Sequence, residues 1–128
     1  MQQVLEICKM IFQHYRDMIV WQKSIDLVDL VYELTTLFPP EEKFDLARQM
    51  RRAAISIASN IAEGQNRNTN KDFAHFLTMS RGSAAELETQ MIICNRRNYL
   101  TADQTQQAFK LLDEISRMLN SLINKLSV

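Results

Sequence analysis

Residues 73–94, FAHFLTMSRGSAAELETQMIIC, decide the fold of this chain. Apolar and small side chains recur there every three or four residues, at Phe73, Leu77, Ser80, Ala84, Leu87, Met91 and Cys94. This spacing follows the 3.6-residue period of an α-helix and continues for about six turns. The stretch therefore predicts a long amphipathic helix with one buried face.

Three further segments carry the same helical period. Their apolar positions are Leu27, Val31, Leu34 and Phe38, with Trp21, Ile25, Val28 and Tyr32 beside them; Met50, Ala53, Ala54, Ile57 and Ile61; and Ala108, Leu112, Ile115, Leu119, Leu122 and Leu126. Four long amphipathic helices with short connections bury such stripes most simply as an antiparallel up-down-up-down four-helix bundle. The expected fold class is all-α.

The ends of the first two helices are marked by proline and glycine. Pro39 and Pro40 should end the first helix at Phe38. The second helix is expected from about Glu41 to Glu63, since acidic side chains suit a helix start. Gly64 then follows as a residue that can adopt a positive φ.

Capping residues mark the third and fourth helices. Thr69 or Asn70 can cap the start of the third helix, and Asn98 is an expected left-handed terminator. Thr101 and Gln104 have the spacing of a capping box at the start of the fourth helix.

Length and composition indicate one bundle domain, expected over residues 15–128. Of the 128 residues, 46% are hydrophobic, and only 2 are Gly and 2 are Pro, which suits a helical globular chain. Residues 1–14 are expected to be a helical extension or a separate arm, because Val4, Ile7, Ile11 and Phe12 are helically spaced. Both readings of that segment stay open.

The cysteines and the opening residues favour a cytoplasmic protein. Cys8 and Cys94 stand far apart and form no CxxC or Cys/His ligand spacing, as expected for reduced thiols. Residues 1–12, MQQVLEICKMIF, lack the features of a secretory signal. The apolar runs are shorter than the ~20 residues that span a bilayer, so no membrane partner is expected.

Catalytic motifs do not occur in the sequence. His14 and His75, the only histidines, belong to no HExxH or Glu-x-x-His pattern, and there is no P-loop, GxGxxG or GxSxG element. Residues 80–83, SRGS, fall within the helical period, so their N–H groups should be used inside the helix rather than on phosphate. We expect no enzymatic activity, metal, cofactor or small-molecule substrate.

A formal net charge of +0 hides an uneven distribution. Residues 1–45 hold eight acidic and four basic residues, whereas residues 46–100 hold eight basic and four acidic residues. An acidic face of one subunit could meet a basic face of another, or the basic face could meet phosphate. A head-to-tail contact of the first kind must close into a ring or continue as a filament.

Some apolar residues fall away from the helical stripes. These are the candidate subunit-interface residues Ile55, Ala85, Ile92 and Ile93. Apolar residues on two faces suggest two burial partners, although scattered exposed isoleucines also occur on monomers.

Several motifs resemble one protein family. They are residues 17–23, DMIVWQK; Phe38 and Pro39 with Glu42 and Phe44; residues 49–64, QMRRAAISIASNIAEG; and residues 81–89, RGSAAELET. From about Tyr15 to Leu126 the chain resembles the four-helix bundle proteins encoded in intervening sequences of bacterial 23S rRNA genes. The accessory variability protein of diversity-generating retroelements belongs to the same superfamily.

The resemblance implies a barrel-like homopentamer without known enzymatic activity. In the retroelement branch, the pentamer binds a reverse transcriptase and nucleic acid through a basic surface, whereas the ribosomal branch has no established biochemical role. Because the retroelement branch is typically strongly basic and this chain is neutral, the ribosomal branch is the closer match. We therefore expect a structural or adaptor protein whose main partner is itself.

Two residue sets remain as candidate sites. Small residues in the motifs allow close helix contacts, and polar groups buried at such a contact must be paired. The motifs therefore predict an interhelical or intersubunit polar network. A catalytic carboxylate pair is the alternative. The network members are Arg52, Asn60, Glu63, Ser83 and Glu86. If RNA or DNA is bound, the candidate contact residues are Arg48, Arg51, Arg67, Lys71, Arg96 and Arg97, repeated in each subunit.

Overall fold

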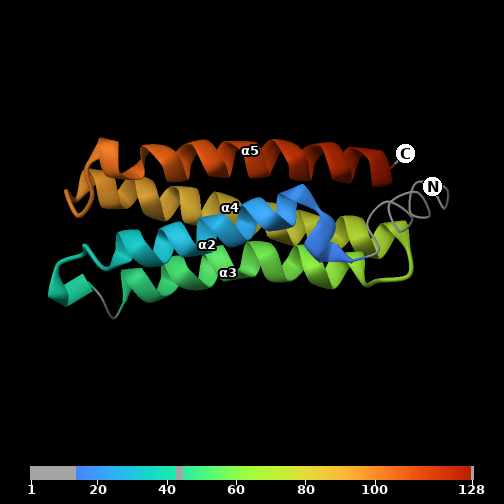
Figure 1. Ribbon diagram of the computed structural model, residues 1–128, viewed down its shortest axis with the longest axis horizontal. Helices are drawn as coiled ribbons and strands as arrows, with labels where there is room; N and C mark the ends of the chain where they lie inside the picture. Colours follow the sequence, from blue (N-terminus) through green and yellow to red (C-terminus); the bar gives the residue numbers. More distant parts are fainter. Residues whose placement is uncertain (1–13, 43–44, 128) are drawn as a thin grey trace.

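Four long helices form an all-α bundle in the computed structural model, which describes residues 14–42 and 45–127. The helices are α2 (Ile19–Thr35), α3 (Leu46–Gln65), α4 (Asn70–Arg96) and α5 (Ala102–Leu126), and two short 3-10 turns are η1 (Tyr15–Asp17) and η2 (Pro40–Glu42). Successive helices run in opposite directions along the bundle (Figure 1). The predicted four-helix bundle is confirmed, and no strand occurs in the part of the chain described.

The helical stripes form the core. Every residue of the α4 stripe from Phe73 to Cys94 is buried, and so is the predicted stripe of α3. In α5 the stripe is buried except at Leu122, which is partly buried. Each helix packs against its neighbours in sequence, and α5 closes the bundle against α2. This arrangement leaves one outward face on each helix.

On α2, only one of the two predicted stripes is fully buried. Leu27, Val31, Leu34 and Phe38 lie in the core. The parallel stripe of Trp21, Ile25 and Val28 is partly buried, and Tyr32 is exposed. The stripe of Trp21 therefore lies at the edge of the bundle, along the groove between α2 and α3.

Three predicted capping sites are confirmed. Thr69 Oγ1 accepts a hydrogen bond from Asp72 N at 3.1 Å at the start of α4. Asn98 has a φ of 62° after the end of α4. At the start of α5, Thr101 Oγ1 accepts from Gln104 N at 3.1 Å and Gln104 Oε1 accepts from Thr101 N at 2.8 Å. These bonds satisfy backbone groups that a helix end leaves open.

The predicted last residue of the first helix and the predicted first residue of the second helix are both wrong by several residues. α2 ends at Thr35, and Phe38 N closes a tighter turn by donating to Thr35 O at 3.3 Å, because a residue before proline disfavours the α conformation. The acidic residues after Pro40 form the separate turn η2 instead of the start of α3. α3 begins after Asp45, whose carbonyl accepts its first backbone bond from Gln49 N at 3.1 Å.

Gly64 lies inside α3 and does not have a positive φ, so its predicted role after the helix end is wrong. A Cβ at Gly64 would lie 2.8 Å from Phe76 Cβ and 3.1 Å from Phe73 Cδ1. The glycine is therefore needed for the close approach of α4, and α3 continues to Gln65 before Asn66 caps it.

At the N-terminal side, α2 does not continue into the preceding residues. Met18 is extended, with a φ of −78° and a ψ of 126°, and η1 packs on α3. The ring of Tyr15 lies 5.3 Å from that of Trp21. The predicted extension over residues 1–14 lies outside the described residues apart from His14. Within the described chain, no helix has the length and apolar character to cross a bilayer.

Candidate interaction surfaces

The contact between α3 and α4 contains a small polar cluster. Ser56 Oγ lies 2.9 Å from Ser83 Oγ, and Asn60 Nδ2 donates to Ser56 O at 2.9 Å and to Ser56 Oγ at 3.0 Å. Nearby, the buried Ser80 Oγ donates to Ile57 O at 2.8 Å. Small hydroxyl side chains at these positions let the two helices approach while their polar groups stay paired.

The five residues of the predicted polar network are not joined as one network within a chain. Of the five residues, hydrogen bonds connect only Asn60 and Ser83, and that connection runs through Ser56. Glu63 instead pairs with Arg67 at 2.6 Å, and Glu86 Oε1 accepts from Gln90 Nε2 at 3.3 Å. Arg52, Glu63 and Glu86 are exposed because they lie toward the outer sides of α3 and α4. Glu86 is bonded within α4, and Glu63 is bonded to Arg67 in the connection that follows α3. Neither contact joins the two glutamates as a carboxylate pair.

The α2–α3 groove is a shallow apolar hollow of about 270 Å³. Its lining residues are Tyr15, Trp21, Ile25, Val28, Ile55, Ala58, Ser59 and Ala62. Ile55, a predicted interface residue, is 42% exposed there. Past the groove, the Arg51 guanidinium lies 4.6 Å from the centre of the Tyr32 ring, and Arg51 Nε donates to Thr35 Oγ1 at 2.9 Å.

The outward face of α4 carries an exposed line of residues spaced four and three apart, which we name the α4 seam. It consists of Lys71, His75, Thr78, Gly82, Ala85, Thr89, Ile92 and Arg96. Thr78 Oγ1 and Thr89 Oγ1 donate to carbonyls of their own helix at 2.9 Å each. A Cβ at Gly82 would have nothing within 4 Å. The middle of the seam is therefore small and uncharged.

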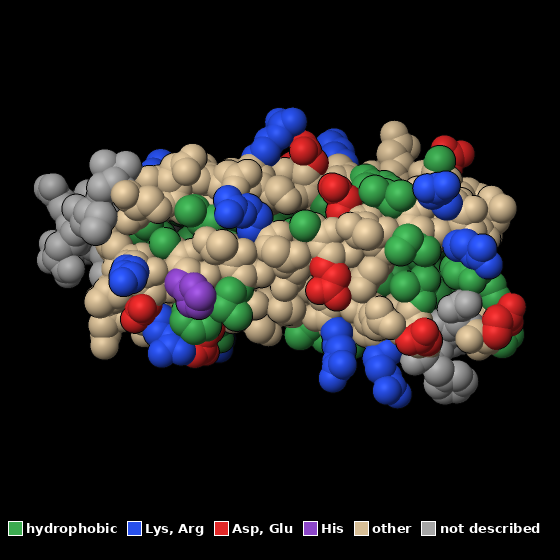
Figure 2. Space-filling model, turned by 180° about the vertical axis from the view of Figure 1, so that it is seen from behind, with side chains coloured by type: hydrophobic (Ala, Val, Ile, Leu, Met, Phe, Trp, Pro, Cys, Tyr) green, Lys and Arg blue, Asp and Glu red, His purple; other side chains and the backbone are tan. Residues whose placement is uncertain are grey.

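The predicted interface residues are divided among different surfaces. Ala85 and Ile92 belong to the α4 seam, whereas Ile93 lies beside the seam and lines a hollow with Arg96 and Arg97. Ile92 is 46% exposed and Ile93 is 42% exposed. Figure 2 shows the molecule from behind, with a hydrophobic patch toward the right-hand end that is flanked by basic and acidic side chains.

The six predicted nucleic-acid contacts do not form one patch on a single chain. Arg48 and Arg51 lie near the start of α3 and Arg96 and Arg97 near the end of α4, which meet at the same end of the bundle (Figure 1). Arg67 and Lys71 lie at the connection from α3 to α4, and the 20 residues of α3 span roughly 30 Å.

Two of these arginines are already engaged within the chain. Arg67 pairs with Glu63 and stacks 4.6 Å from the centre of the Phe76 ring, and Arg51 bonds Thr35. Within the described residues, Arg48, Lys71, Arg96 and Arg97 take part in no ion pair. Of the six predicted contacts, these four are the side chains most available to a partner.

The surface of α2 and its flanking turns is acidic. Asp17, Asp26, Asp29, Glu33 and Glu41 are exposed, and none has an ion-pair partner in the described part of the chain. Sequence reasoning anticipated this acidic region, but it did not identify the ion pair that ties α2 to α5. Lys23 Nζ lies 2.7 Å from Glu114 Oε2, and this hydrogen bond and charge lower the pKa of Glu114 below its ordinary value.

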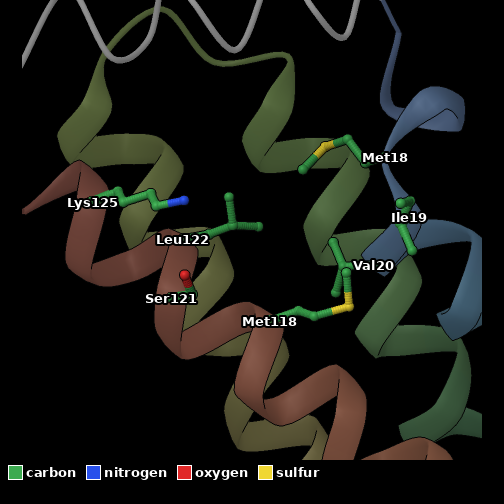
Figure 3. A pocket seen from close by; sticks show the side chains of 7 residues that line it. All are labelled: Met18, Ile19, Val20, Met118, Ser121, Leu122 and Lys125. Atoms are coloured by element: carbon green, nitrogen blue, oxygen red, sulfur yellow. The ribbon is translucent and has the colours of Figure 1, made fainter.

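A second apolar groove lies between the start of α2 and the end of α5 (Figure 3). Met18, Ile19 and Val20 face Met118 and Leu122 across a hollow of about 230 Å³, with Ser121 and Lys125 also on the α5 side. Ile19 is 56% exposed. The sequence did not reveal this groove, because the relevant residues are separated by almost the whole length of the bundle domain.

Metal-ligating residues do not gather in the described chain. No group of three His, Cys, Asp or Glu residues there could hold a metal ion. Cys94 is buried, and its thiol lies 3.6 Å from Met50 Sδ.

Comparisons with known proteins agree with the architecture. The family model described as 23S rRNA-intervening sequence protein matches residues 16–121. A solved structure of a protein with unknown function from the S23 ribosomal protein family, from Bacteroides thetaiotaomicron, is similar with a TM-score of 0.77 and 25% sequence identity. That match covers 82% of this chain and 98% of the other. No curated protein matches the chain.

Proposed function

Because the chain belongs to the family of 23S rRNA-intervening sequence proteins, we propose that it is a non-enzymatic protein that assembles with itself into a homopentameric ring. In this proposal the ring is a structural or adaptor element of the cytoplasm, and it presents the same surface several times to a partner. Its activity is binding rather than chemical transformation.

The observation that carries the proposal is the exposure of large apolar residues on different sides of the bundle. Ile55 lies in the α2–α3 groove, while Ile92 and Ile93 lie on α4, and all three are more than one-third exposed. Burial of such residues against another copy would remove apolar surface from water. Two different surfaces on each chain support a head-to-tail contact, and a closed contact of that kind gives a ring.

The molecular mass in solution tests this proposal. Light scattering on the eluting peak of a sizing column should give about five times the mass of one chain, which is 14.9 kDa. Another closed assembly would contradict the pentamer but retain self-assembly. A single-chain mass at micromolar concentration would contradict the ring altogether.

A second candidate function is nucleic-acid binding as an accessory to a reverse transcriptase. The basic residues Arg48, Arg96 and Arg97 at one end of the bundle favour it, because they are exposed and make no ion pair among the described residues. Five copies would present this modest group as a larger basic surface even though each chain has no net charge.

An electrophoretic mobility assay separates the two candidates. Structured RNA and duplex DNA at low salt should shift with the assembled protein if the basic end binds phosphate, and the shift should weaken as salt rises. The double variant Arg96→Gln, Arg97→Gln should give a weaker shift than the unmodified protein. Lys125→Gln, at the far end of α5, serves as the matched control. An absent shift with an intact assembly would contradict this second candidate.

A further inference from the structure

No contact within a single chain explains why residue 82 is a glycine. It lies in the interior of the 27-residue helix α4, where glycine is among the least favourable residues. Gly64 is different, because its missing Cβ makes room for Phe73 and Phe76. At Gly82 an added Cβ would meet nothing within 4 Å. A glycine at an open site in a helix interior points to a close approach from outside the chain.

The residues around Gly82 fit close packing by another helix. The α4 seam repeats every four and three residues, which is the spacing of a helix–helix contact line. Its central members Thr78, Gly82, Ala85 and Thr89 are small, and both threonine hydroxyls are bonded within α4. The seam can therefore enter a narrow apolar groove without burying an unpaired hydroxyl.

The same chain offers such a groove on another side. The α2–α3 groove has an apolar floor that includes Ile25, Val28 and Ile55. Its α2 wall is lined from Trp21 to Val28, a stretch that spans roughly 11 Å. The centre of the seam from Thr78 to Ala85 spans a similar length on α4, since both stretches have helical rise.

The charges of the α4 seam and of the α2 wall of the groove are complementary. The α4 seam is basic at its ends, at Lys71 and Arg96, and uncharged between Thr78 and Ile92. The α2 side carries exposed acidic residues, from Asp17 before the helix to Glu41 after it. Pairing of two seams with each other would instead bring like charges together at both ends, which disfavours that arrangement.

We propose that the α4 seam of one copy packs into the α2–α3 groove of a second copy. This inference rests on the proposed self-assembly and names the two surfaces that make the contact. Because seam and groove are different surfaces, a single contact leaves one copy with a free groove and the other with a free seam. Successive copies therefore add in the same sense until the ring closes.

Two single substitutions test the contact from its two sides. Gly82→Met fills the small centre of the seam, and the open space around Gly82 lets the chain keep its fold. Ile55→Glu places a carboxylate in the groove beside the acidic helix. Gln106→Met is the matched control, because it adds the same side chain to an exposed position on α5. Helicity by circular dichroism checks folding, and Gly82→Ala is a milder replacement if Gly82→Met fails to fold.

The decisive measurement is the mass of each variant alone and of their equimolar mixture, by light scattering at high micromolar concentration. We expect each variant to fall to the mass of one chain, and the control to keep the mass of the unmodified protein. The mixture should give twice the mass of one chain, because the intact seam of the Ile55→Glu variant can enter the intact groove of the Gly82→Met variant.

Other outcomes would overturn the contact. A folded variant that keeps the unmodified mass, dissociation of the control, or a mixture that stays at one chain each contradicts it. Dissociation by Gly82→Met together with an unaffected Ile55→Glu variant would indicate seam-to-seam pairing instead. A single-chain mass for the unmodified protein would refute self-assembly itself, whereas an assembled protein insensitive to both changes would refute only the seam-to-groove contact.

Discussion

Ser56 Oγ and Ser83 Oγ lie 2.9 Å apart and link the middle of α3 to the middle of α4. Ser56 comes from the QMRRAAISIASNIAEG stretch and Ser83 from the RGSAAELET stretch. Two of the motifs that carry the family resemblance are therefore in direct contact. Their small residues set a close helix approach, and the hydroxyl pair satisfies polar groups at the contact, so helix packing accounts for these small and polar residues.

Replacement of Asn60 by Ala should destabilise the bundle. Its Nδ2 donates to Ser56 O and to Ser56 Oγ, and both bonds are lost in the variant. We expect a loss of about 1 kcal/mol in the free energy of unfolding, which lowers the melting temperature by a few degrees. Thermal unfolding followed by circular dichroism measures this change. Asn68→Ala, at an exposed loop position, is the control, and equal melting temperatures for both variants would contradict the role of Asn60.

A double-mutant cycle on Ser56 and Ser83 should show coupling between the two hydroxyls. Each single change to Ala leaves the other hydroxyl without its partner across the helix contact, whereas the double change removes both. The double variant should therefore lose less stability than the two single variants together, with a coupling energy of about 0.5 to 1.5 kcal/mol. Chemical denaturation of the four proteins gives this energy. Strict additivity would show that the serines contribute independently.

The two glycines should respond to alanine in opposite directions. Gly64→Ala places a Cβ 2.8 Å from Phe76 Cβ, so strain of about 1 to 3 kcal/mol should exceed the roughly 1 kcal/mol gained in helix propensity. Gly82→Ala has open space and should raise the stability of the free chain by up to about 1 kcal/mol. Denaturant unfolding of dilute, unassembled protein measures both. Stabilisation by Gly64→Ala would contradict the close approach of α4.

The buried stripes and the caps could be predicted because they depend on residues close together in sequence. The stripe from Phe73 to Cys94 and the capping box of Thr101 are of this kind. Gly64 was misassigned because glycine serves both at helix ends and at close helix contacts, and only the position of Phe76 distinguishes them. The sequence around Gly64 does not show how close Phe76 of the neighbouring helix lies.

The candidate surfaces were only partly predictable for a related reason. Helical angles identified Ile55 and Ile92 as outward residues, and both are exposed. The same angles could not show that Arg51 and Arg67 stack on aromatic rings, or that the six basic residues divide between the two ends of the bundle. Those facts depend on how neighbouring helices are placed beside one another.

The ion pair between Lys23 and Glu114 should make the contact of α2 with α5 dependent on pH. The hydrogen bond and charge of Lys23 lower the pKa of Glu114 in the folded chain below its ordinary value of 4.5. A carboxyl whose pKa is lowered by folding stabilises the fold above its unfolded pKa, and this stabilisation is lost as the pH falls through the folded pKa. The contribution should be small and sensitive to salt, because both side chains are about one-third exposed.

The variant Lys23→Met isolates this effect. At neutral pH it should melt below the unmodified protein, and the difference should shrink as the pH falls below 4.5 and Glu114 becomes protonated. Arg117→Met is the control, since it removes an exposed pair with Asp113 inside α5 and leaves the α2–α5 contact intact. A constant difference in melting temperature across this pH range would show that Lys23 acts through the packing of its alkyl chain, because packing does not change as a carboxylate is protonated.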